Sequence, residues 1–289
     1  MQIPSLKFVI AAKLASDLIR GPESKRDSKM KNPVRFIGAG PGDPELITVK
    51  GMRFLQEADR VVYTGSLVPK TLLQYCKDAV DAYDSSSLTL EQTHALLKQG
   101  YEAGERVVRL HTGDPSLYGA IYEQTALLDR DGIAYEVTPG VSAAFAAAAA
   151  LNQELTIPEI SQTVILTRLG GRTPVPEGEK LSSLASHRAT LVIYLSVQRI
   201  EEVVVQLKPH YPADTPVVIA YRVSWPEQKL IRGTLDNIAD KVRAAKVERQ
   251  AVIFVGEVFK TKGLTGEKVK RSKLYDETFC HSFRNAKDG

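Results

Sequence analysis

The chain contains few of the residues on which metal-binding and secreted proteins depend. Its two cysteines, Cys76 and Cys280, are too few and too isolated to form a zinc site, so we expect no protein-bound metal. The sequence has no convincing secretion signal, and a reducing cytoplasm is therefore the expected compartment. Near the amino terminus the longest apolar run, residues 8–12, ends at Lys13 and is too short to cross a bilayer.

The chain also lacks a strong charge of one sign. Its 38 basic and 34 acidic residues leave a net charge of +4, and the basic excess lies partly in the tail. We expect a solvated or dimer-packing tail rather than a nucleic-acid site, and neither nucleic acid nor membrane as a partner. The 289 residues, 43% of them hydrophobic, suffice for two compact domains.

The composition and hydrophobic pattern of the sequence predict four segments. Residues 1–32 combine helical apolar spacing with a polar linker, which suggests a dispensable or disordered leader, or alternatively a partner-binding or targeting helix. In residues 33–152 strands and helices alternate, which is typical of an α/β domain with a mostly parallel sheet. Residues 153–259 indicate a second α/β domain with a mixed sheet, and residues 260–289 form the basic tail.

The most informative segment, VRFIGAGPGDPELIT, occupies residues 34–48 and joins a short strand, a glycine turn and a helix start. Asp43 is expected to cap a helix whose first position is Pro44, and further helices are expected from Pro69 and over residues 90–102. A dinucleotide fingerprint needs a sixth-position glycine where Asp43 stands, so the segment argues against a nicotinamide site. A tight turn without a ligand is the alternative to a ligand loop.

Two further loops follow the same pattern of apolar strand, glycine and helix. They are HTGDPSLYG at residues 111–119 and TPGVSA at residues 138–143. In a parallel sheet such loops lie at the carboxyl ends of their strands, where α/β proteins bind ligands. The three loops are therefore predicted to line one crevice.

These loops resemble those of the tetrapyrrole (corrin/porphyrin) methyltransferases that use S-adenosylmethionine. GAGPGDP at residues 38–44 and GDP at residues 113–115 are similar to the whole family. The segments at residues 111–120, 155–158 and 162–177 resemble the branch that methylates C11 of precorrin-4 or its cobalt form, whereas the siroheme branch usually has GGDPF at the second loop. Relatives in the siroheme branch have Tyr-Asp-Arg-Leu-Val where this chain has Tyr63-Thr64-Gly65, so no catalytic role of that Asp is transferred.

The resemblance implies two α/β domains with S-adenosylmethionine in the cleft between them, a homodimer, and a tetrapyrrole substrate. The residues that it places at the cofactor are Pro41, Thr112, Gly113, Asp114, Leu117, Ser142 and Ala143, with Leu195 and Tyr221 matched only by their place along strands. Arg168, Arg172 and Arg222 are expected to pair with substrate carboxylates, although each could instead be an exposed loop charge.

Methyl transfer from a sulfonium requires alignment of donor and acceptor rather than a nucleophilic side chain. A base or water must accept the proton that leaves the macrocycle. His111 and Asp114 are weak catalytic candidates, since a lone histidine is more often structural and Asp114 also suits a helix cap. Methylation at another position of a corrinoid or siroheme precursor, such as uroporphyrinogen III, and a non-catalytic nucleotide-binding module remain as alternatives.

Overall fold

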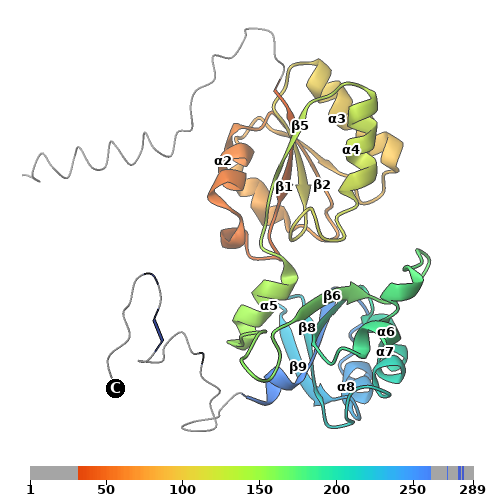
Figure 1. Ribbon diagram of the computed structural model, residues 1–289. Coiled ribbons are helices and arrows are strands. Elements are labelled where there is room, and N and C mark those ends of the chain that lie inside the picture. Colours follow the sequence, from red (N-terminus) through yellow and green to blue (C-terminus); the bar gives the residue numbers. More distant parts are fainter. Residues whose placement is uncertain (1–31, 262–271, 273–278, 281, 283–289) are drawn as a thin grey trace, which may run out of the picture.

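The computed structural model describes residues 32–261 together with residues 272, 279, 280 and 282. Nearly all of the predicted leader and most of the basic tail lie outside the described residues. The described chain forms two five-stranded sheets, which Figure 1 shows one above the other with helix α5 at their junction.

The first sheet is parallel throughout, as the alternating sequence predicted. Its strand order is β3-β2-β4-β1-β5, with β1 in contact with both β4 and β5. The strands are β1 (Val34–Gly38), β2 (Arg60–Tyr63), β3 (Asp81–Asp84), β4 (Val107–His111) and β5 (Tyr135–Thr138). Since Gly38 pairs with His111 and Ile37 with Thr138, the carboxyl ends of β1, β4 and β5 are level, and the loops that follow them leave the sheet on the same side.

Helices cover both faces of this sheet. They are α2 (Val49–Glu57), α3 (Leu90–Glu102) and α4 (Ile121–Arg130), with the 3-10 turns η1 (Pro44–Leu46) and η2 (Lys70–Tyr75). Phe54 and Leu55 of α2 pack in one core cluster with Ile37, whereas Leu97 of α3 and Leu128 of α4 lie in another.

The helix predicted from Pro44 is instead a single 3-10 turn. Asp43 accepts a hydrogen bond from the Glu45 backbone as expected, but the backbone is extended again at Ile47. The α-helix begins at Val49, where the side chain of Thr48 accepts a hydrogen bond from Gly51. The predicted helix from residue 69 is likewise only η2.

The second sheet is mixed, also as predicted. Its order is β6-β7-β10-β8-β9, with β6 parallel to β7 and the other pairs antiparallel. The strands are β6 (Val164–Arg168), β7 (Thr190–Tyr194), β8 (Pro216–Tyr221), β9 (Lys229–Thr234) and β10 (Ala251–Val255). The helices α6 (Leu181–Ala185), α7 (Ile200–Leu207) and α8 (Ile238–Ala244) share one core with it, and η3 (Glu177–Glu179), η4 (Val197–Arg199) and η5 (Glu257–Lys260) are 3-10 turns.

The alanine-rich helix α5 (Ala143–Leu151) covers the other face of the second sheet. Its buried alanines pack with Val192, Val218 and Phe254, because small side chains let a helix approach a sheet closely. The expected border between residues 152 and 153 would group this helix with the first sheet, whereas its core contacts lie with the second.

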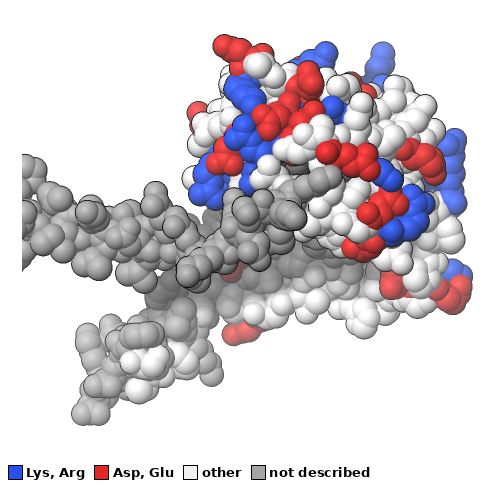
Figure 2. Space-filling model, turned by 90° about the horizontal axis from the view of Figure 1, so that it is seen from above, with Lys and Arg blue, Asp and Glu red and all other residues white. Residues whose placement is uncertain are grey.

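Acidic and basic side chains are interspersed on the described surface near the first sheet (Figure 2). Several of the partly exposed ones form ion pairs, including Lys50 with Glu136 at 3.5 Å and Arg106 with Asp59 at 2.9 Å. Across the described residues, no helix combines the length and the apolar character needed to span a membrane.

Candidate active site

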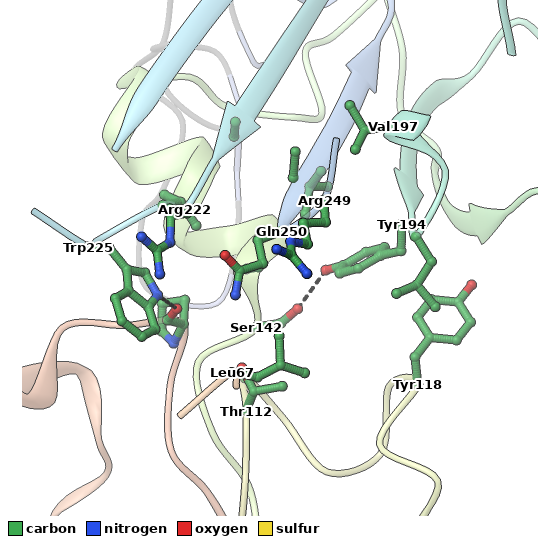
Figure 3. A pocket seen from close by; sticks show the side chains of 18 of the residues that line it. Leu67, Thr112, Tyr118, Ser142, Tyr194, Val197, Arg222, Trp225, Arg249 and Gln250 are labelled. Carbon is green, nitrogen blue, oxygen red and sulfur yellow. Dashed lines mark hydrogen bonds between the residues drawn. The ribbon is translucent and has the colours of Figure 1, made fainter. Parts of the chain in front are cut away.

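A cavity of about 750 Å³ lies between the two sheets. Both halves of the chain line it, through the loops after β1, β4 and β5 on one side and segments around β7, β8 and the start of β10 on the other. Its volume lies within the range of small-molecule sites. Figure 3 shows Trp225 and Arg222 at one end of it and Tyr118 and Tyr194 at the other.

The three glycine loops converge at this cavity, as their positions in the sequence predicted. Gly40 and Gly113 form an isolated β-bridge, in which the Gly113 N–H donates to the Gly40 carbonyl at 2.8 Å. The third loop packs so closely that a Cβ on Gly140 would lie 2.1 Å from the carbonyl oxygen of Gly113. Only glycine therefore fits at position 140, and the backbones of the loops form one continuous wall.

The carboxylate of Asp114 connects the loop at residues 111–119 with the loop at residues 138–143 through hydrogen bonds. One carboxylate oxygen accepts hydrogen bonds from the Ser116 backbone at 2.8 Å and from the Ser116 hydroxyl, and the other accepts from the Gly140 N–H at 2.9 Å. Burial alone would raise the pKa of Asp114, but these hydrogen bonds outweigh it and hold the pKa below its ordinary value. Asp114 is thus an ionised residue that lines the cavity and orders its loops.

His111 does not line the cavity, although it is the first residue of the loop at 111–119 that does. Its side chain is buried and stacks on Phe36 with ring centroids 5.7 Å apart. Burial, aided by the positive charge of Arg109, lowers the pKa of His111 to about 3. The imidazole is therefore neutral near pH 7.

Two tyrosines that sequence reasoning did not single out form one end of the cavity. The rings of Tyr118 and Tyr194 lie 5.4 Å apart. The Tyr194 hydroxyl shares a hydrogen bond with Ser142 at 2.7 Å and accepts one from the Ala144 N–H at 3.0 Å. Burial raises the pKa of Tyr194 although these hydrogen bonds lower it, so the phenol stays protonated at neutral pH. Tyr194 thereby joins the second sheet to the start of α5.

Most of the sequence-predicted site residues surround the cavity. The lining includes Pro41, Thr112, Gly113, Asp114, Leu117, Ser142, Ala143, Leu195 and Arg222. Tyr221, Arg168 and Arg172 are not among the lining residues, and Arg172 lies on an exposed loop. Arg168 donates to backbone carbonyls of Leu169, Thr173 and Pro174, so its guanidinium holds that loop.

The residues that sequence reasoning missed come mainly from the second half of the chain. They include Tyr118, Tyr194, Trp225, Arg249 and Gln250. Trp225 is the only tryptophan in the sequence, which could have drawn attention to it, but it belongs to no motif that would have placed it at the site. In the part of the chain that the structure describes, no group of three or more His, Cys, Asp or Glu side chains is arranged to hold a metal ion.

Comparison with known proteins identifies the family. The family model for Tetrapyrrole (Corrin/Porphyrin) Methylases matches residues 33–239, which is most of the chain and includes all three glycine loops. The chain belongs to the tetrapyrrole methylases. The family and fold predicted from the glycine loops are therefore confirmed.

This tetrapyrrole methylase is similar over nearly its whole length to curated relatives. It is 50% identical to the precorrin-4 C(11)-methyltransferase of Pseudomonas aeruginosa, with 87% of this chain and 98% of the relative covered. It is 48% identical to the cobalt-precorrin-4 C(11)-methyltransferase of Methanocaldococcus jannaschii, with 88% and 96% covered.

Two solved structures of tetrapyrrole methylases show the same fold. A cobalt precorrin-4 methyltransferase gives a TM-score of 0.76 at 45% identity and covers 78% of this chain and 95% of its own. The uroporphyrin-III C-methyltransferase of Thermus thermophilus, complexed with S-adenosyl homocysteine, gives 0.66 at 28% identity and covers 80% and 100%.

Proposed function

We propose that this protein transfers a methyl group from S-adenosylmethionine to C11 of precorrin-4 or cobalt-precorrin-4, a step of cobalamin biosynthesis. The observation that carries the proposal is the likeness, at about half identity and over almost complete lengths, to relatives that bear this activity in their names. Identity to the uroporphyrin-III enzyme structure is only 28%, which favours the C11 position over that alternative. We further propose a cytoplasmic homodimer.

The residues present fit S-adenosylmethionine. The glycine loops expose backbone along one wall of the cavity, and Ser142 and Ala143 place the start of α5 there, where a helix dipole suits a carboxylate. We assign the cofactor contacts to the lining residues predicted from the sequence, and place Tyr221 at their border. When bound, the cofactor supplies an electrophilic methyl group on a sulfonium.

The role of the protein in this reaction is to align the donor with the acceptor and to exclude water. Asp114 holds two loops at a fixed spacing through its hydrogen bonds to Ser116 and Gly140. Tyr194 holds the opposite wall against Ser142. Both contacts fix the width of the cavity on the side of the glycine loops.

Arginines of the cavity suit a substrate that carries acetate and propionate groups. Arg222 and Arg249 line the cavity, and Arg222 is held near Glu227 at 3.4 Å with its buried Nε not hydrogen-bonded to protein. We assign Arg222 as the preferred partner of a substrate carboxylate and Arg249 as a further partner. Arg168 and Arg172 remain proposed contacts at the end of β6.

Titration calorimetry with S-adenosylhomocysteine tests the proposed cofactor site. The wild-type protein should bind this product analogue, and Leu195→Arg should weaken binding at least tenfold, because Leu195 lines the cavity and is 76% exposed, so the new side chain occupies ligand space without disturbing the core. Val205→Arg is the matched control, since Val205 is a 68% exposed residue of α7 outside the lining. Equal effects of the two substitutions, or no binding by the wild type, would contradict the assignment.

A further inference from the structure

The turn that follows β8 reaches across the cavity and contacts the first glycine loop. The Trp225 indole Nε1 donates to the Pro41 carbonyl at 2.8 Å, and the Asp43 backbone N–H donates to the Ser224 hydroxyl at 2.9 Å. These contacts join residues more than 180 positions apart in the sequence. Two adjacent residues of one half thus hold both ends of a three-residue segment of the other.

Between these two hydrogen bonds, the indole ring packs directly on Gly42. A Cβ built on Gly42 would lie 2.3 Å from Cδ1 and 2.5 Å from Nε1 of Trp225, and these indole atoms are the nearest to it. Such a distance is far inside van der Waals contact, so an alanine at this position would force the ring away. The absence of a side chain at Gly42 therefore allows the indole ring of Trp225 to pack against the backbone there.

The turn that carries Trp225 is itself held in an uncommon conformation. Arg222 and Ser224 both have positive φ, 43° and 66°, which costs free energy for residues with a side chain. The Arg222 N–H donates to the Gln250 carbonyl at 2.9 Å, and the Arg222 guanidinium lies 4.8 Å from the centre of the indole ring. The surrounding contacts thus hold the turn in the shape that aims Trp225 at Pro41.

We propose that Trp225 is a positioning residue for methyl transfer, which acts through the 41–43 loop. Pro41 lines the cavity, and the ring of Trp225 fixes the position of this loop relative to the second sheet. Seating of the indole on Gly42 therefore sets the width of the cofactor cavity at this end. The inference rests on the proposed function, since it takes the cavity to be the cofactor site.

A double-mutant cycle between Gly42→Ala and Trp225→Ala tests this coupling. Each single variant should weaken binding of S-adenosylhomocysteine about tenfold or more, because the loop loses its fixed position. In the Trp225→Ala background, Gly42→Ala should change the affinity less than twofold, since the ring that it displaces is no longer there. Gly178→Ala serves as a control, because a Cβ on Gly178 meets no atom within 4 Å.

A second readout separates displacement of the ring from a general loss of fold. Trp225 is the only tryptophan, so its fluorescence reports this contact alone. Gly42→Ala should shift the emission to longer wavelength, as the indole leaves the Pro41 carbonyl for water, while Gly178→Ala should not. If the wild type binds the ligand but the affinity losses of Gly42→Ala and Trp225→Ala are additive in the double variant, this inference alone is overturned. Unshifted emission in Gly42→Ala would overturn it in the same way. Failure of the wild type to bind S-adenosylhomocysteine would overturn the proposed function as well.

Discussion

Individual buried residues show how the first sheet holds the loop at residues 111–119, which lines the cavity. Arg109 and His111 lie two positions apart on β4 and both are buried. Arg109 donates to Gln124 at 2.9 Å and to the Val62 carbonyl at 3.2 Å, so its charge is held by neutral acceptors. His111 forms a hydrogen bond with the Gly119 backbone, which spans the two ends of the loop that lines the cavity. We assign His111 a structural role in closing this loop.

Replacement of His111 by Phe should flatten the pH dependence of stability. The pKa of His111 is about 3 in the folded protein and about 6.5 when unfolded, so between these values the unfolded chain binds more protons. Stability should therefore fall as the pH drops from about 6.5 towards 3, by on the order of 4 kcal/mol from this group. Denaturant unfolding at several pH values measures the effect. Carboxylates such as Asp59 titrate in both proteins, so an identical pH profile in wild type and variant would refute this role.

At the scale of elements, local signals predicted the helices whose caps agree with their apolar spacing. The expected helix at residues 90–102 matches α3, because Thr89 and Gln92 form a reciprocal capping box. The start of α2 was predicted five residues early, because Asp43 and Thr48 are both good caps and the backbone between them is extended at Ile47. Strand β3 (Asp81–Asp84) was missed because its exposed sequence has no apolar alternation, and its pairing with β2 defines it.

The capping box of α3 gives a prediction at this scale. Thr89→Ala removes the hydroxyl that accepts from the Gln92 N–H at 3.2 Å. The variant should lose about 1 kcal/mol of unfolding free energy, the usual cost of an N-cap. Urea unfolding measures the loss, with Thr71→Ala as the control, since Thr71 is also exposed but caps no helix. Equal losses in the two variants would show that the box contributes nothing specific.

At the scale of the whole molecule, the sequence predicted one wall of the cavity better than the other. The glycine loops follow strands of a parallel sheet, and topology alone brings their ends to one edge. The other wall comes from the ends of mixed-sheet strands and the turns beside them. Contacts to the first half of the chain are made by Tyr194 at the end of β7, Trp225 in the turn after β8 and Gln250 just before β10, which bind Ser142, Pro41 and Ser66 respectively. Such contacts between distant segments depend on how the two sheets pack, which no local pattern encodes. The arginines at residues 168 and 172 were placed by motif, and the fold keeps them outside the lining.

The position of the transferred methyl group tests the central claim most directly. The purified protein is incubated with S-adenosylmethionine labelled in its methyl carbon and with either precorrin-4 or cobalt-precorrin-4, and the product is analysed by mass spectrometry and carbon NMR. The proposed function predicts one added methyl group, whose labelled carbon is bonded to C11, in at least one of the two reactions. A product methylated at any other ring carbon, or no methylated product from either substrate by a protein that binds S-adenosylhomocysteine, would contradict it.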